Sequence, residues 1–268
     1  MEFLDPRSGR DPSTGIGLYF GEDFEGIKAA AKLQKEIRDE VIDQIKPGTT
    51  THKLNNIALK LIKEAGAAPL FRGYGGFPDA ICASVNEQIV HGTANKRKLK
   101  SGDIISLDLG VKLNGFCGDS CRTVAVGNKY KNKNDELIII TATYAFFAGL
   151  RKAKPGNTIG DIGHAIHEEI LKPKNSKGSP IFDMYEKFMG HGIGHNLHEK
   201  PQVPNYGFEG HGHLIVPGMC ICIEPVLIHA TSKVTQTDMF TMVSDDGKTA
   251  CHHENQVYIS DKGPIILT

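Results

Sequence analysis

Residues 104–119 read IISLDLGVKLNGFCGD, an apolar run that is interrupted by the dipeptide Asn114-Gly115 and resumes after it. Asn-Gly between two strand-like runs favours a two-residue type I′ turn, because both residues tolerate the positive φ that this turn requires. The sequence therefore predicts a β-hairpin in which Leu113 pairs with Phe116, and this pair sets the register along both strands.

The predicted register places two aspartates on one face of the sheet. Asp108 lies opposite Cys121 and Asp119 lies opposite Gly110, so the two aspartates are diagonal neighbours about 7 Å apart at the backbone. Acids near strand ends are usually solvated, but Asp108 lies within an apolar run, where a lone carboxylate would need a partner. Two carboxylates at this separation either repel each other or share cations, and metal binding is the less costly solution.

A helix-turn-helix pattern occurs twice along the chain. KPGTT at 46–50 and KPGNT at 154–158 each separate two stretches with helical periodicity. These stretches are 24–45 and 51–66 in the first copy, and 135–153 and 162–170 in the second. The Gly-led apolar strands that end at Asp108 and Glu224 also correspond, so we infer an internal duplication in which each half contributes one acid to the centre. For the helices alone, the alternative is that Pro-Gly merely separates unrelated segments.

Further candidate residues come from the C-terminal half. Glu254 begins the alternation Glu254, Gln256, Tyr258, which places the acid on one face of a strand. The glycines of GHGIGH (190–195) disfavour a helix and let the backbone approach a ligand closely, so His191 and the later His198 are candidate site residues. Eight other histidines lie on helical patterns or have no distinguishing spacing: His52, His164, His167, His211, His213, His229, His252 and His253.

The composition is that of a globular domain. The chain has 268 residues, of which 40% are hydrophobic and 23% charged, and its formal charge of zero provides no global attraction to nucleic acid or an anionic membrane. The longest apolar run, 137–150, is shorter than the about 20 residues that span a bilayer. Six cysteines without a C-x-x-C pair predict free thiols, and the lack of a signal-peptide pattern favours the cytoplasm. We expect a flexible leader at 1–21, native or left by cloning, followed by a single domain at 22–268.

Short motifs along the chain carry a family resemblance when they are taken together. They are GFP (76–78) with CASVNE (82–87) and VHG (90–92), Asp103-Ile104 through Asp108, Gly115 with Gly118-Asp119, GHGIG (190–194), HEKP (198–201), PGM (217–219) with IEP (223–225), and Glu254. In this order they resemble type I methionine aminopeptidases over about residues 22–268. The resemblance implies an α+β "pita-bread" fold, in which two pseudo-symmetric halves form a curved antiparallel sheet covered by helices around a central dinuclear metal site.

The resemblance also implies that two divalent ions bind to four carboxylates and one imidazole. These ligands are Asp108, Asp119, His191, Glu224 and Glu254. Asp119 and Glu254 are shared between the ions, and the donor set suits Mn²⁺, Fe²⁺, Co²⁺ or Zn²⁺. Two such ions hold a bridging water as hydroxide near neutral pH, which hydrolyses the peptide bond without a covalent intermediate. Glu224 is then the general base, and His198 and His91 hydrogen-bond the developing oxyanion and the scissile amide nitrogen.

The implied activity is removal of the initiator methionine from nascent proteins and peptides when the second residue is small and uncharged. The implied substrate-binding residues are His91, His198, Tyr74, Phe77, Cys82 and Phe240, the last four forming an apolar pocket suited to a thioether. Phe240 occupies a position where many bacterial members have Trp, Phe71 stands where some have Cys, and Asn255 departs from the pattern of several relatives. The resemblance therefore leaves the pocket shape and selectivity open.

Other functions fit parts of the pattern. Prolidase and aminopeptidase P share the fold but add a large N-terminal domain, for which the leader leaves no room, and type II methionine aminopeptidases carry a helical insertion that is not seen here. A non-catalytic relative typically lacks the metal ligands, and a two-metal nuclease would need a basic, aromatic groove. The basic segment 96–100 is either a solvated loop or a ribosome-facing patch. We expect a monomer with no membrane or nucleic-acid partner.

Overall fold

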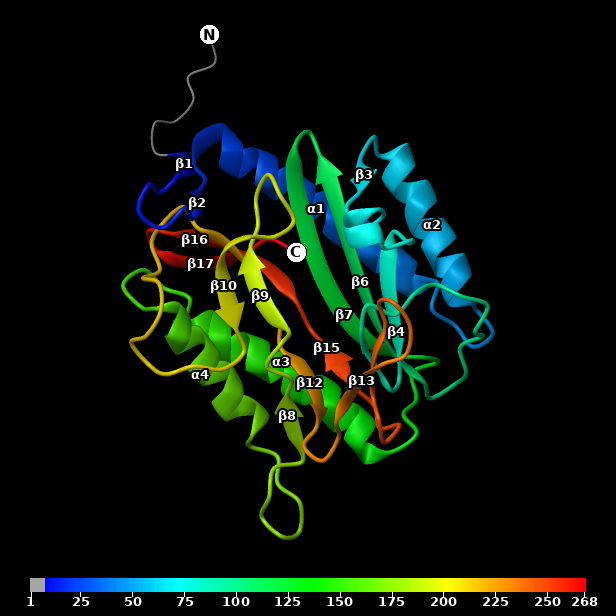
Figure 1. The fold of residues 1–268 in the computed structure, drawn as a ribbon. Helices are drawn as coiled ribbons and strands as arrows, with labels where there is room; N and C mark the ends of the chain where they lie inside the picture. The colour runs from blue at the N-terminus through cyan, green and yellow to red at the C-terminus, as the bar shows by residue number, and fades with distance from the viewer. Residues whose placement is uncertain (1–7) are drawn as a thin grey trace.

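The computed structural model describes residues 8–268, and its first half combines a helix pair with antiparallel strands (Figure 1). Helix α1 (Gly21–Asp43) packs on β6 (Ile104–Leu113) and β7 (Phe116–Ala125). Its contact face follows the predicted periodicity, with apolar residues such as Ile27 and Val41 buried. Thr50 caps the N-terminus of helix α2 (Thr51–Glu64), where its side chain accepts a hydrogen bond from the Lys53 amide. The remaining elements of this half are β3 (Ala68–Pro69), η1 (Tyr74–Gly76), β4 (Ile81–Val85) and β5 (Gln88–Val90).

The second half repeats this arrangement, which agrees with the inferred duplication. Helices α3 (Lys133–Lys152) and α4 (Ile159–Ile170) begin with capping boxes at Asn132 and Thr158. Helix α3 contacts the central strands β11 (Cys220–Ile223), β12 (Val226–His229) and β15 (Cys251–His252). The other strands of this half are β8 (Phe182–Met184), β9 (Met189–Gly192), β10 (Glu199–Pro204), β13 (Val234–Gln236), β14 (Met242–Ser244), β16 (Asn255–Ser260) and β17 (Gly263–Ile266).

The hairpin of β6 and β7 has the predicted turn and register. Asn114 and Gly115 have φ values of 49° and 89°, and Leu113 pairs with Phe116. Further along the same ladder Asp108 pairs with Cys121, and Asp119 pairs with Gly110. The prediction that both aspartates face one side of the sheet as diagonal neighbours is therefore confirmed.

A second antiparallel ladder carries the acids of the C-terminal half. Strands β11 and β16 end with the pair Ile223–Asn255, and β12 and β15 resume the pairing with Val226 opposite His252. Glu224 follows Ile223 and Glu254 precedes Asn255. In an antiparallel ladder the same register therefore places Glu224 and Glu254 opposite each other. Backbone hydrogen bonds between Cys121 and Glu254, of 3.4 and 3.0 Å, join this ladder to β7. The two halves thus meet edge to edge at the acids.

The N-terminal segment packs against the domain before residue 22. Residues 8–20, within the predicted leader, form a short hairpin of β1 (Gly9–Arg10) and β2 (Gly17–Leu18). Ile16 and Tyr19 are only 1% and 4% exposed, and the Tyr19 hydroxyl donates to the Glu199 carboxylate at 2.6 Å. They belong to the short run IGLYF (16–20), which is too short to show a helical or strand period, so the sequence pattern did not reveal them. The rest of the predicted leader, residues 1–7, lies outside the described residues.

Two predictions from composition agree with the structure. All six cysteines are free and buried: Cys82, Cys117, Cys121, Cys220, Cys222 and Cys251. Among residues 8–268, no helix combines the length and apolarity needed to cross a bilayer.

Candidate active site

The predicted acids meet in one row across the sheet. Asp108 lies opposite Cys121, Cys121 exchanges backbone hydrogen bonds with Glu254, and Glu254 lies opposite Glu224. Residues that pair across neighbouring strands point to the same face, and Asp119 shares this face because it precedes Cys121 by two residues. The register of long-range strand pairing therefore brings the acids together.

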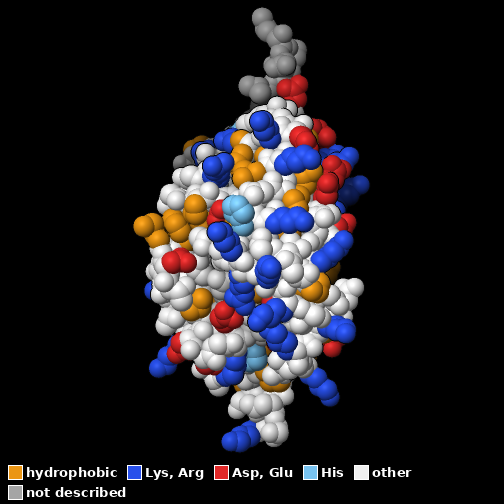
Figure 2. Space-filling view, turned by 90° about the vertical axis from the view of Figure 1, so that its right-hand side faces the viewer, with side chains coloured by type: hydrophobic (Ala, Val, Ile, Leu, Met, Phe, Trp, Pro, Cys, Tyr) orange, Lys and Arg blue, Asp and Glu red, His pale blue; other side chains and the backbone are white. Residues whose placement is uncertain are grey.

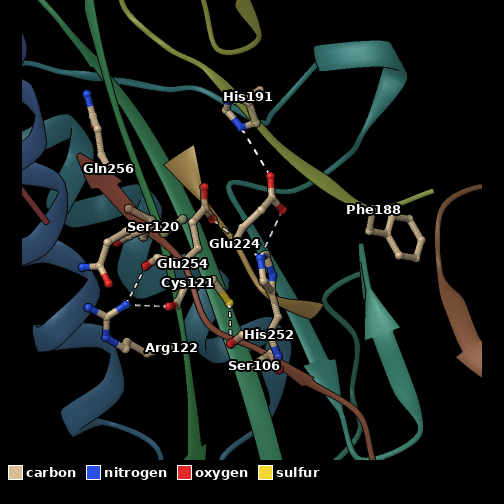
Figure 3. Close-up of polar contacts among 12 residues, drawn as sticks. Ser106, Ser120, Cys121, Arg122, Phe188, His191, Glu224, His252, Glu254 and Gln256 are labelled. Atoms are coloured by element: carbon tan, nitrogen blue, oxygen red, sulfur yellow. Dashed lines mark hydrogen bonds and ion pairs between the residues drawn. The ribbon is translucent and has the colours of Figure 1, made fainter. Parts of the chain in front are cut away.

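His191 joins the row from the neighbouring strand. Gly192 of β9 pairs with Ile221 of β11, so His191 lies beside Cys222 on the acidic face. The Nδ1 atom of His191 lies 2.9 Å from the Gly192 carbonyl oxygen, while Nε2 lies 3.8 Å from Glu224 Oε1 (Figure 3). A ring held through one nitrogen with the other nitrogen directed at carboxylates is the usual arrangement of a metal-binding histidine.

The donor atoms cluster closely enough to share cations. Two groups have ligand atoms that all lie within 4.8 Å of one another. One contains Asp119, His191, Cys222 and Glu254, and the other contains Asp108, His252 and Glu254. Glu254 belongs to both groups, as the predicted sharing of this carboxylate requires.

Burial gives the carboxylates a high electrostatic cost. It raises the pKa of Glu224 to about 8, and burial together with the charge of Glu224 raises the pKa of Glu254 to about 7. Burial and the charge of Glu254 raise the pKa values of Asp108 and Asp119 well above their usual range. The Oδ1 atoms of both aspartates are buried without a hydrogen-bond partner among the described residues. Divalent cations would supply the missing counter-charge, so the residues present fit a metal centre.

A cavity of about 370 Å³ opens over this row, and every predicted site residue lines it. At its apolar end Phe71, Phe77, Cys82 and Leu197 form a buried cluster, and the half-buried Phe240 packs against them. The rings of Phe77 and Phe240 meet edge to face at 5.3 Å between centroids. The carboxylate row and the apolar pocket are therefore parts of one cavity, whose volume suits a small ligand.

His91 and His198 line the same cavity as neutral imidazoles. Burial, followed by the nearby His252, lowers the pKa of His91 to about 4, and burial also lowers the pKa of His198. The Tyr74 hydroxyl lies 2.7 Å from Nδ1 of His198 and orients that ring. His91 has a φ of 56°, a left-handed conformation that non-glycine residues rarely adopt and that is frequent at functional sites.

Sequence reasoning missed His252, whose spacing does not distinguish it from the other unassigned histidines. Its Nε2 atom lies 3.3 Å from Glu224 Oε2 and 3.8 Å from Glu254 Oε2, and Figure 3 shows Glu224 between His191 and His252. The available signal was strand periodicity, because His252 precedes Glu254 by two residues and so shares its face. Other lining residues that the sequence did not suggest are Val90, Lys187, Phe188, Met189 and Leu197.

Comparison with known proteins agrees with this geometry. The chain is 43% identical to methionine aminopeptidase of Clostridium acetobutylicum over 248 residues, which span 92% of this chain and 96% of that protein. It is 40% identical to methionine aminopeptidase 1 of Bacillus subtilis over 244 residues, which span 90% and 94% of the two chains.

Solved structures show the same fold. Methionine aminopeptidase from Rickettsia prowazekii has a TM-score of 0.87 at 31% identity, with 94% of this chain and 99% of that chain covered. Prolidase from Pyrococcus horikoshii OT3 shares the fold at a TM-score of 0.73 and 20% identity, with 94% and 63% of the chains covered. These likenesses confirm the predicted α+β pita-bread fold. Because residues 25–261 match the family model, the chain belongs to metallopeptidase family M24.

Proposed function

We propose that this protein is a metal-dependent aminopeptidase that removes N-terminal methionine from nascent proteins and peptides. One observation carries the proposal: a single cavity contains both the row of carboxylates and imidazoles and the apolar pocket. The names of the relatives support methionine as the residue removed. A preference for a small, uncharged second residue is carried over from the family resemblance.

The row of acids would hold two divalent cations. The proposed ligands are Asp108, Asp119, His191, Glu224 and Glu254. The unpaired Oδ1 atoms of Asp108 and Asp119 and the membership of Glu254 in both donor groups support this assignment. Cations at this place would polarise the scissile carbonyl and make a water molecule a better nucleophile near neutral pH. The donor set is compatible with Co²⁺, Mn²⁺, Fe²⁺ or Zn²⁺.

Protein side chains would manage the protons and the developing charge. Glu224 accepts the proton of the attacking water at a carboxylate oxygen and returns it to the leaving amine nitrogen. His198, whose ring is oriented by the Tyr74 hydroxyl, donates a hydrogen bond to the oxygen that becomes negatively charged. His91 bonds to the scissile amide nitrogen and holds it over the acids. A neutral ring at His91 can accept a hydrogen bond from the amide N–H, and a neutral ring at His198 still has one N–H to donate, which agrees with the lowered pKa values of both histidines.

The apolar pocket would bind the methionine side chain. Phe71, Phe77 and Cys82 are each less than 10% exposed, so an apolar side chain that entered here would leave water entirely. Aromatic edges and a thiol also suit the polarisable sulfur of a thioether. Seating this side chain fixes the position of the next peptide bond relative to the acids.

Peptide hydrolysis tests the proposal directly. We expect release of methionine from Met-Ala-Ser, but not from Met-Lys-Ser, after Mn²⁺ or Co²⁺ is added to chelator-treated protein. Chelator alone should abolish the activity, and re-addition of the ion should restore it. Equal or faster cleavage of Xaa-Pro peptides would instead support the activity of the prolidase branch. Absence of any peptidase activity with all four metals would support a non-catalytic relative.

The proposed substrate also suggests where the protein works. Nascent chains emerge in the cytoplasm. The protein has a net charge of zero, but one of its faces is basic and would contact the ribosome. Figure 2 shows this face, over α2 and the 95–100 loop, where Lys and Arg side chains predominate. Exposed lysines of these segments are Lys53, Lys60, Lys63, Lys96, Lys98 and Lys100.

Docking to the ribosome can be tested by co-sedimentation. Glu replacements at Lys96, Lys98 and Lys100 should reduce sedimentation with ribosomes at low salt. Matched replacements at the exposed Lys172, Lys174 and Lys177 should not. Equal sedimentation of the two triple variants would reject this face as the docking surface.

A further inference from the structure

The ring of His252 is buried at the acidic row with no hydrogen-bond partner for one nitrogen. The residue is 5% exposed, and its Nε2 atom has no hydrogen bond to any described residue. Nε2 nevertheless lies 3.3 Å from Glu224 Oε2 and 3.8 Å from Glu254 Oε2. A buried ring nitrogen left unsatisfied costs free energy, so its position among carboxylates needs a physical explanation.

The distances match two ligands of one cation. Donor atoms that each lie about 2.1 Å from a shared cation, at angles of about 90–110°, are about 3.0–3.4 Å from each other. The separation between His252 Nε2 and Glu224 Oε2 falls in this range, and the pair does not meet the geometry of a hydrogen bond. A ring nitrogen of His252 also lies within 4.8 Å of the ligand atoms of Asp108 and Glu254.

The alignment of the strands directs the ring to this place. His252 is two residues before Glu254 and therefore faces the cavity, which it lines. The next residue, His253, faces the other side, where its ring packs near Phe146 and its Nδ1 lies 3.4 Å from the Thr143 hydroxyl. The imidazole of His252 therefore faces the acids, and that of His253 packs against α3.

We propose that His252 is an additional metal ligand, through Nε2, on the side of the centre that contains Asp108. This inference rests on the metal centre of the proposed function, but not on its specificity for methionine. Without His252, the group on this side offers carboxylate oxygen alone, a donor set that suits Mn²⁺. The imidazole adds a nitrogen donor and shifts the preference of this position towards Zn²⁺ and Co²⁺.

Metal titration of the folded protein tests the assignment. Chelator competition with Zn²⁺, Co²⁺ and Mn²⁺ would be measured for the wild type, His252→Gln and His253→Gln, with circular dichroism to verify the fold. In His252→Gln we expect binding of one of the two Zn²⁺ or Co²⁺ ions to weaken by about tenfold or more, while Mn²⁺ binding changes less. His253→Gln should match the wild type. Equal Zn²⁺ affinity in His252→Gln and the wild type would overturn the proposal.

A measurement on unmodified protein keeps the inference testable if the His252 variant does not fold. In the Co²⁺-loaded wild type, paramagnetically shifted ring-proton resonances count the coordinated imidazoles. Resonances from two histidines, His191 and His252, would support the proposal. Resonances from one histidine in protein that binds two ions would overturn it while leaving the proposed metal centre intact. Failure of the wild type to bind any of the three ions would reject the centre itself.

Discussion

His91 combines two features that a purely structural histidine does not need. Its backbone is held at a φ of 56°, and its ring packs against Phe188 at the wall of the cavity. Backbone strain of this kind costs of order 1–3 kcal/mol and persists only where the surroundings impose it. At the residue scale, His91 is therefore the best candidate for a group that contacts the peptide without binding metal.

Replacing His91 by Ala should lower kcat by about 10²–10³, because a hydrogen bond to the reacting amide is lost. Metal content should stay near that of the wild type, since His91 is not one of the proposed metal ligands. Turnover of Met-Ala-Ser and metal analysis of the same preparation measure the two quantities. The control is His52→Ala on the exposed face of α2, which should be neutral. Loss of metal from the His91 variant would show that it is a ligand instead.

Phe77 should control the selectivity of the apolar pocket. Its side chain is 7% exposed and supports Phe240 edge to face, so Phe77→Ala opens the pocket and removes contact area for the methionine side chain. We expect kcat/KM for Met-Ala-Ser to fall about 10- to 200-fold, the effect of about 1–3 kcal/mol of lost apolar contact. Phe147→Ala, a change at an exposed aromatic residue of α3, is the matched control. Unchanged kcat/KM in the Phe77 variant would place the methionine elsewhere.

At the element scale, the sequence predicted the first ladder better than the second. Asn114-Gly115 defines both the turn and the register of β6 and β7, so the positions of Asp108 and Asp119 followed from local information. The second ladder has no such turn signal next to Glu224 and Glu254, and its contact with Cys121 spans about half of the chain. The convergence of Glu254 and His252 with the aspartates therefore could not be derived from local patterns.

Asp103 joins three loop positions just before β6 and should make the stability of the protein depend on acid pH. Its carboxylate is 3% exposed and accepts hydrogen bonds from Asn86 Nδ2 at 3.0 Å, Lys131 Nζ at 2.6 Å and the Lys100 amide at 2.9 Å. Burial alone would raise the pKa of Asp103. The bonds to Asn86, Lys131 and the Lys100 amide outweigh this effect and hold the pKa below its ordinary value of 3.8.

Asp103→Asn should therefore lower the free energy of unfolding by about 1–3 kcal/mol at pH 7. Because the folded pKa is depressed, the contribution of the charge is present above the unfolded value of 3.8 and is lost as the pH falls through the folded pKa. The difference in the free energy of unfolding between the variant and the wild type should thus shrink below about pH 4. Urea unfolding of both proteins at pH 7, 5 and 3 measures this difference. Asp261→Asn, at an exposed site, should show no such difference. A constant difference at all three pH values would exclude the charge as its cause.

At the scale of the whole molecule, the duplicated plan explains why the site lies at the centre. Each half contributes a helix pair and a strand that ends in or contains an acid, and the halves join where Cys121 meets Glu254. Repeated motifs and helical periodicity were enough to predict this plan. The packing of Ile16 and Tyr19 was not predictable, because a segment without a period is recognised as part of a domain only through the surface that it covers.

Removal of metal should make the stability of the whole molecule depend on neutral pH. In the metal-free protein, Glu254 and Glu224 have pKa values of about 7 and 8, above the ordinary value of 4.5. The folded state therefore holds these protons more tightly than the unfolded state. The stabilisation is complete below pH 4.5 and is lost as the pH rises through the folded values. Below pH 6.5 the lowered pKa values of His91 and His191 act in the opposite direction, so we expect the Tm of chelator-treated protein to fall between about pH 6.5 and 8.

Bound cations should reverse this loss, because they favour the ionised carboxylates. Cation at a concentration 100-fold above its Kd adds about 2.7 kcal/mol of stability per site. In a domain of this size that corresponds to a rise in Tm of about 5–10 °C at pH 7.5. Calorimetry of chelated and loaded protein from pH 5 to 8 measures both effects, and Asp103→Asn should retain the full metal-dependent rise because its side chain lies outside the centre. If loaded and chelated protein follow the same Tm profile, the buried acids do not bind cations, and the peptidase mechanism has no metal centre on which to rest.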